Sequence, residues 1–125
     1  MAINSSPTVL IVDDEIFFRQ FLRDILEQEG LVIVAEAVNG DDAVEKYRKY
    51  RPDITFMDIF MPEKNGLEAI REIIAFDSNA IILVCSGGGY DDELQAARNA
   101  GARQSILKPF MLEEIREALR DIQSA

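Results

Sequence analysis

The sequence predicts an α/β fold in which a β-strand and an α-helix alternate five times along the chain. Short apolar runs of strand length recur at regular intervals, and the segments between them carry apolar residues at the helical period. Strands that alternate with helices form a parallel sheet with helices on both faces, because such crossovers are right-handed. We therefore expect one doubly wound α/β domain.

Five apolar runs give the expected strands. They are residues 9–12, 31–35, 54–57, 80–85 and 105–107. The expected helices are residues 18–26, 43–50, 67–74, 91–100 and 112–122. Gly30 and Gly101 stand where helix C-termini are expected, and Pro52 keeps the second helix from running into the third strand.

The fourth expected helix buries little apolar surface. Its inward face offers only Leu94 and several alanines, and three glycines, Gly87, Gly88 and Gly89, precede it. We expect this helix and its entry loop to have low local stability. Two interpretations stay open at this point: a tolerant surface loop, or a mobile switching element.

Charge and composition exclude several classes of function. The 125 residues carry a net charge of −10, which disfavours binding to nucleic acid or to anionic membranes. The chain has no histidine, which excludes His-based catalytic triads, His-ligated metals and a histidine phosphodonor. The single cysteine, Cys85, excludes an internal disulfide and suits a reducing compartment, so we expect a cytoplasmic protein with Cys85 in its core.

The first seven residues are expected to form a loosely ordered leader before a single domain at 8–125. They have neither the basic start nor the apolar core of a signal peptide. No apolar run is long enough to span a bilayer, so we expect no membrane contact.

Polar side chains follow four of the predicted strands at the point where each strand ends. Asp13 and Asp14 follow the first strand, Asp58 the third, Ser86 the fourth and Lys108 the fifth. In doubly wound sheets, ligands bind beyond the carboxyl ends of the strands. Two carboxylates repel by ~4 kcal/mol at about 4 Å and an effective dielectric of about 20, so a cation such as Mg²⁺ is expected there.

Asp58 interrupts the apolar stretch ITFMDIFMP at residues 54–62. An unpaired buried carboxylate costs several kcal/mol, so we expect Asp58 to have a partner, with Lys108 pairing with it at rest. A carboxylate that attacks a phosphoryl group needs a cation and an ammonium to neutralise the developing charge. We predict that Asp58 forms an aspartyl phosphate. The plainer alternative is that Asp13 and Asp14 only cap the first helix.

Four motifs together resemble the receiver domain of two-component response regulators, the CheY-like family. They are IVDDE at 11–15, MDIFMPEKNG at 57–66, VCSGGG at 84–89 and ILKPF at 106–110. The resemblance extends over about residues 8–122. It implies a five-stranded parallel sheet of flavodoxin-like order 2-1-3-4-5, doubly wound as (βα)5, in a single domain.

The resemblance also implies a chemistry for these residues. A receiver domain takes a phosphoryl group from a sensor histidine kinase or a phosphotransfer protein, and its contacts with a downstream protein then change. It promotes only its own phosphorylation and dephosphorylation. The implied output region is residues 90–122, and the implied metal is Mg²⁺, with Mn²⁺ as the alternative. The implied site residues are Asp13, Asp14, Asp58 and the backbone carbonyl of Phe60 for the metal, Asp58 as phosphoacceptor, and Ser86 and Lys108 for phosphoryl contacts.

Ser105 departs from the family pattern, which commonly has Tyr or Phe three residues before the lysine. A hydroxymethyl group cannot fill the pocket of a ring, so the usual rotamer change is in doubt. We expect signalling to use the glycines at 87–89 and the fourth helix instead. Ser86 and Tyr90 are further switch candidates.

Three other functions compete with this interpretation. A receiver-like scaffold that works without phosphorylation is favoured by Ser105 alone. A magnesium-dependent phosphohydrolase that passes through an aspartyl phosphate would have a second Asp two residues after the nucleophile, where Phe60 stands. A flavodoxin-like cofactor binder would need a glycine-rich and hydroxyl-rich loop after the first strand, and the three acids at 13–15 would repel a phosphate there.

Overall fold

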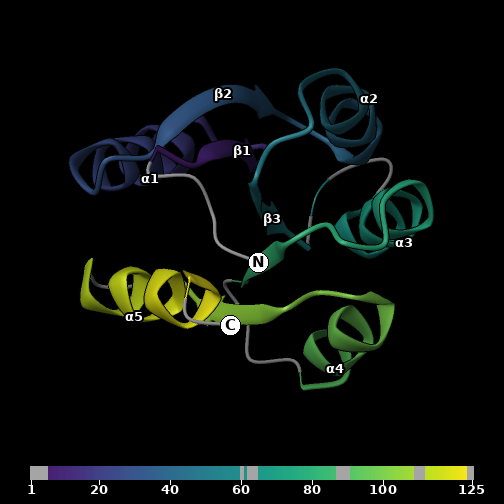
Figure 1. The fold of residues 1–125 in the computed structure, drawn as a ribbon. Coiled ribbons are helices and arrows are strands. Elements are labelled where there is room, and N and C mark those ends of the chain that lie inside the picture. Colours follow the sequence, from purple (N-terminus) through teal and green to yellow (C-terminus); the bar gives the residue numbers. More distant parts are fainter. Residues whose placement is uncertain (1–5, 60, 62–64, 87–90, 109–111, 124–125) are drawn as a thin grey trace.

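The structure is a computed structural model, and it describes residues 6–59, 61, 65–86, 91–108 and 112–123. Strands and helices alternate strictly along the chain (Figure 1). The strands are β1 Thr8–Val12, β2 Val32–Ala37, β3 Ile54–Asp58, β4 Ile82–Ser86 and β5 Gln104–Leu107. The helices are α1 Ile16–Gln28, α2 Gly40–Tyr50, α3 Gly66–Phe76, α4 Asp91–Ala100 and α5 Leu112–Gln123.

The five strands form one parallel sheet in the order β2-β1-β3-β4-β5. Helices α1 and α5 lie on one face of the sheet, and α2, α3 and α4 lie on the other (Figure 1). The doubly wound (βα)5 fold predicted from the sequence is therefore confirmed, including the strand order 2-1-3-4-5.

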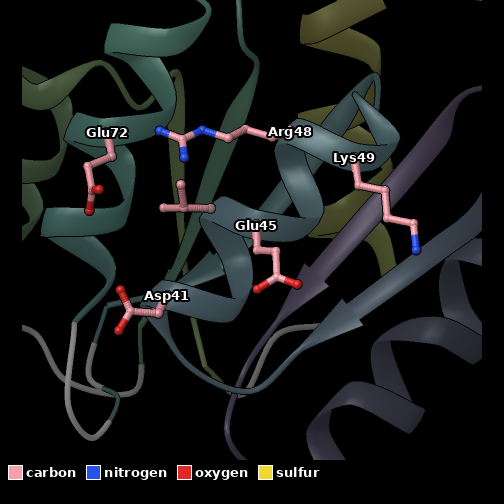
Figure 2. A pocket seen from close by; sticks show the side chains of 6 residues that line it. Asp41, Glu45, Arg48, Lys49 and Glu72 are labelled. Atoms are coloured by element: carbon pink, nitrogen blue, oxygen red, sulfur yellow. The ribbon is translucent and has the colours of Figure 1, made fainter.

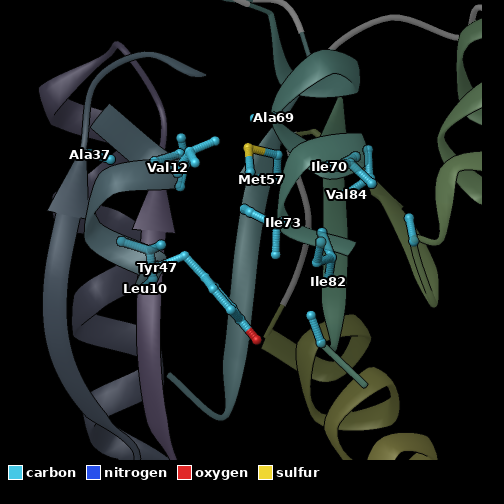
Figure 3. Close-up of a cluster of buried hydrophobic side chains, with 14 of the residues drawn as sticks. Leu10, Val12, Ala37, Tyr47, Met57, Ala69, Ile70, Ile73, Ile82 and Val84 are labelled. Carbon is cyan, nitrogen blue, oxygen red and sulfur yellow. The ribbon is translucent and has the colours of Figure 1, made fainter. Parts of the chain in front are cut away.

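Each face of the sheet buries its own hydrophobic cluster. Leu10, Met57 and Val84 on successive strands meet residues of α2 and α3 such as Tyr47 and Ile70, as Figure 3 shows. On the opposite face, β-strand residues including Phe56 pack with apolar residues of α1 and α5. Alternate residues of one strand serve opposite clusters, which is why the strands read as continuous apolar runs in the sequence.

All five strands differ by one or two residues from the limits of the predicted runs, and the differences are largest in β2 and β4. β2 extends to Ala37 and so includes Glu36, which lies opposite Ile11 in the ladder. The predicted run ended before Glu36 because a charged residue was taken as the end of a buried strand. β2 is an edge strand, however, and a charged side chain there can reach solvent and ion-pair partners. β4 begins at Ile82, two residues later than predicted, because the N–H of Ala80 closes a turn onto the carbonyl of Asp77.

Helices α1 and α4 end shortly before Gly30 and Gly101, the glycines expected at helix C-termini. Gly30 and Gly101 have φ values of +88° and +123°, the left-handed region that glycine adopts without strain. Arg51 ends α2 with a φ of +46°, and this non-glycine C-cap directly precedes Pro52. Among the described residues, none of the helices has the length and apolar character needed to cross a bilayer.

Candidate functional site

The sheet brings together two carboxylates that lie far apart in the sequence. β1 and β3 are neighbours, with Val12 opposite Met57 in the ladder. Asp13 follows β1 and Asp58 ends β3, so both side chains stand at the carboxyl edge of the sheet. Asp13 has no exposed surface and Asp58 is 4% exposed. Burial of two acids side by side requires positive charge nearby.

Asp14 completes a cluster that we call the acidic rim, consisting of Asp13, Asp14 and Asp58. One oxygen from each carboxylate lies within 4.8 Å of the others. Asp14 is exposed, so the rim is open to solvent on its side. A few carboxylate oxygens on an open edge match the preference of Mg²⁺, which keeps several waters and takes only one or two protein carboxylates and a phosphate oxygen. The donor set therefore fits a hard divalent cation.

Lys108 brings an ammonium from the end of β5 to the acidic rim. Its Nζ donates to Asp13 Oδ2 at 2.5 Å and lies 3.7 Å from Asp58 Oδ2. The ion pair with Asp58 agrees with the sequence prediction, and a shorter ion pair with Asp13 accompanies it. Burial lowers the pKa of Lys108, but the hydrogen bond to Asp13 and the charges of Asp58 and Asp13 outweigh it, so the pKa is raised.

The backbone around Asp13 is fixed by three hydrogen bonds. The Asp13 N–H donates to the carbonyl of Ala37, and Arg19 Nη1 donates to the Asp13 carbonyl at 2.7 Å. Asp13 Oδ1 accepts the N–H of Glu15 at 2.9 Å. Glu15 is the N-cap residue of α1, and its side chain makes no capping hydrogen bond. The pattern of residues gave no signal for this contact of Arg19, because the acceptor is a main-chain carbonyl.

Gly66 sets the close approach of α3 to the end of β3. Its N–H donates to the carbonyl of Ile59 at 2.9 Å. A Cβ at this position would collide with the carbonyl oxygen of Asp58 and would lie 2.8 Å from the Cα of Ile59. The glycine in the motif MDIFMPEKNG is thus required by backbone contact beside the predicted phosphoacceptor.

The remaining predicted site residues lie wholly or partly outside the described residues. Ser86 ends β4 opposite Leu107, but its side chain lies outside the description. Phe60, Tyr90 and the glycines at 87–89 also lie outside the described residues. Their predicted roles stay predictions.

Ser105 is placed, and it borders a hollow. It lies in β5 opposite Val84. The hollow has a volume of about 310 Å³ and runs between β5 and α5. Its lining residues are Gln104, Ser105, Ile106, Glu114, Glu117, Ala118 and Asp121.

A larger hollow of about 540 Å³ lies between α2 and α3 (Figure 2). Both acidic and basic side chains line it, and Arg48 extends toward α3, where Glu72 lies. It shares no residue with the acidic rim, and its mixed charges favour no single ligand.

Cys85 is buried, as predicted, and it lies beside the acidic rim. Burial raises the pKa of its thiol to about 12.

Sheet order, acidic rim and lysine together define a class of protein, and the sequence matches that class. The chain belongs to the response regulator receiver domain family, which it matches over residues 9–120. It is a receiver domain of a two-component response regulator.

Chemotaxis proteins are prominent among its relatives. The CheY of Thermotoga maritima is 48% identical over 114 residues, which are 91% of this chain and 95% of that protein. The CheY of Bacillus subtilis is 45% identical over 89% of this chain and 92% of that protein. A crystal structure of the CheX–CheY–BeF3–Mg complex from Borrelia burgdorferi superposes with a TM-score of 0.91 at 31% identity, covering 97% of this chain and 95% of the matched chain.

Proposed function

We propose that Asp58 is the phosphoacceptor of this receiver domain and that the acidic rim holds Mg²⁺, or Mn²⁺, during the reaction. The observation that supports this most strongly is the meeting of four groups from three separate strands: Asp13 and Asp14 after β1, Asp58 on β3 and Lys108 after β5. A structural ion pair would need one carboxylate. Three carboxylates around one ammonium leave net negative charge for a divalent cation to balance.

The chemistry follows from these positions. A carboxylate oxygen of Asp58 attacks the phosphorus of a phosphohistidine, an O–P bond forms, and the N–P bond breaks with its electron pair going to the imidazole. Bound Mg²⁺ supplies positive charge to the phosphoryl oxygens. Lys108, already 3.7 Å from Asp58, is placed to donate to one of those oxygens, and Ser86 is the proposed second donor.

The phosphodonor is a sensor histidine kinase or a phosphotransfer protein. Three side chains in the first half of α1, directly after the acidic rim, fit contact with a protein. Ile16, Phe17 and Phe21 are 54%, 83% and 46% exposed. Apolar groups left in water beside a reactive site favour a partner that covers them. These 125 residues contain no histidine, so the phosphohistidine lies outside them.

The output is a change in protein contacts over residues 90–122, in a domain that extends over 8–125 in the cytoplasm. CheX accompanies CheY in the Borrelia burgdorferi complex, and we propose that this chain likewise acts on a separate protein. The only reactions that the domain promotes are the formation and the hydrolysis of its own aspartyl phosphate.

Intact-protein mass spectrometry tests the proposal. Incubation with acetyl phosphate and Mg²⁺ should add one phosphoryl group, and chelation of the metal should abolish the addition. Asp58→Asn should stay unmodified, whereas Asp24→Asn, which removes an exposed acid on α1, should react as the wild type does. Equal modification of Asp58→Asn and the wild type would refute the assignment.

A further inference from the structure

Phe18 places an aromatic ring against the ammonium of Lys108. Phe18 is the third residue of α1, and its partly buried side chain packs on the cluster that α1 and α5 share with the sheet. Lys108 Nζ lies 3.9 Å from the centroid of the Phe18 ring. Cation–π attraction operates within about 6 Å of a ring centroid, so this contact is a close one.

The ring lies beside an ammonium with little access to water. The Lys108 side chain is only 14% exposed. Asp13 Oδ2 accepts one of its hydrogen bonds at 2.5 Å, and Asp58 Oδ2 lies 3.7 Å away. Cation–π attraction strengthens as the cation is desolvated, because water competes less for the charge. The Phe18 contact therefore has the environment in which such contacts are strongest.

Asp13 has a second proposed partner, the divalent cation, which would compete with Lys108 for its carboxylate during the reaction. Asp13 belongs to the acidic rim, so its oxygens are shared between the ammonium and any divalent cation bound there. A cation on Asp13 weakens the hold of that carboxylate on Lys108. The Phe18 ring is uncharged and lies outside the carboxylate set, so its hold on the ammonium does not compete with the metal.

We propose that Phe18 is a positioning residue whose ring keeps the Lys108 ammonium at the acidic rim, facing Asp58, and thereby speeds phosphoryl transfer to Asp58. The inference rests on the proposed function, in which Lys108 contacts a phosphoryl oxygen. It adds a residue that touches neither the metal nor the phosphoryl group. Loss of the ring's negative face should let the ammonium leave the rim and slow the transfer.

The contact itself is tested by NMR without metal or phosphodonor. Because Lys108 Cε is bonded to the Nζ that lies 3.9 Å from the ring centroid, its protons should show an upfield ring-current shift in the wild type. The shift should vanish in Phe18→Leu and persist in Phe18→Tyr. An unshifted Lys108 signal in the wild type would overturn the inference whatever the protein's activity.

The effect on the reaction is tested with acetyl phosphate and Mg²⁺. Phe18→Leu should lower the phosphorylation rate by about two- to thirty-fold, the range that a cation–π contact provides, and Phe18→Tyr should restore it. Phe76→Leu is the matched control: it removes a ring that lies 5.0 Å from Arg51, outside the acidic rim, and should leave the rate unchanged. Thermal unfolding of each variant checks folding, and Phe18→Met replaces Phe18→Leu if the latter does not fold.

Fluorinated phenylalanines at position 18 separate charge from packing. Adding one, two and three fluorines withdraws the ring's negative charge with little change of shape, so the rate should fall stepwise. A rate equal to wild type in Phe18→Leu, or no trend across the fluorinated series, would overturn the inference while the proposed function stands. If the wild type itself takes no phosphoryl group, the proposed function fails, and the role of Phe18 in that reaction fails with it.

Discussion

Thr55 has a buried hydroxyl in the middle of β3 for which no hydrogen-bond partner lies within reach among the described residues. The side chain has no exposed surface. Residues two apart on a strand share a face, so Thr55 lies on the face of Met57, against the cluster under α2 and α3. A hydroxyl without a partner in such a place lowers stability.

Thr55→Val should therefore stabilise the protein. Valine has nearly the same shape and removes the desolvated hydroxyl, so the free energy of unfolding should rise by about 1 kcal/mol. Urea denaturation measures the change. A matched change at a partnered hydroxyl, Thr8→Val, should destabilise, because Thr8 Oγ1 bonds with Asp53. Destabilisation by Thr55→Val would show that its hydroxyl has a partner in solution.

The individual residues of the site could be predicted only in part from the sequence. The sequence indicated Asp13, Asp58 and Lys108 because each polar residue follows an apolar strand, and strand ends gather at one edge of the sheet. It gave no signal for the contact of Lys108 with Phe18 or for the shorter pairing with Asp13. Both depend on the direction that a long, flexible side chain takes among several nearby groups, and residue order does not encode that direction.

At the scale of elements, a network of charges joins α1 to β2. Arg19 Nε and Arg23 Nη2 donate to the two oxygens of Glu36 at 2.8 and 2.6 Å. Burial raises the pKa of Glu36, but its hydrogen bonds and charge interactions with the two arginines outweigh this, so the pKa is lowered from 4.5. Arg19 also holds the carbonyl of Asp13, so the network supports the acidic rim.

This network makes a prediction for acid stability. Because the folded-state pKa of Glu36 is lowered, its contribution is present above pH 4.5 and is lost as the pH falls through the folded-state pKa. Glu36→Gln should cost roughly 1–2 kcal/mol at neutral pH. The gap from the wild type should close as the pH falls. Glu27→Gln, which removes a more exposed partner of Arg23, should cost much less. A gap that does not depend on pH would contradict the assignment.

A second element-scale prediction concerns α4. Among the α4 residues whose burial the structure describes, only Ala97 is buried, and Leu94 is half-buried. Helix α3, by contrast, buries Ala69, Ile70 and Ile73. Less buried apolar area gives less stabilisation. Amide hydrogen exchange should therefore be faster in α4 than in α3. Equal protection of the two helices would count against α4 as the mobile part of the output region.

The order of elements was predictable because apolar runs and helical periods are local signals. Strand limits were less so. The prediction left Glu36 out of β2 because its ion pair with α1 is a tertiary contact, which a short stretch of sequence does not reveal. The motif at 57–66 included Gly66, but the reason for a glycine there, its close approach to the backbone of Asp58, depends on how α3 meets β3.

For the molecule as a whole, the acidic rim couples stability to magnesium. A ligand that binds the folded state alone stabilises it, by about 1.4 kcal/mol at ten times its dissociation constant. Thermal unfolding should thus shift upward with Mg²⁺ in the wild type. Asp13→Asn should lose most of this shift, and Asp24→Asn should keep it. Equal shifts in all three proteins would mean that the cation binds elsewhere.

We propose that the sheet presents Asp58 as the reactive member of the acidic rim. Borohydride reduction of the phosphorylated protein, followed by peptide mass spectrometry, locates an acyl phosphate, because reduction converts the modified aspartate to homoserine. The claim predicts homoserine at position 58 alone, and only when Mg²⁺ and the phosphodonor were both present. Homoserine at position 13 or 14, or a phosphate that resists reduction, would contradict it.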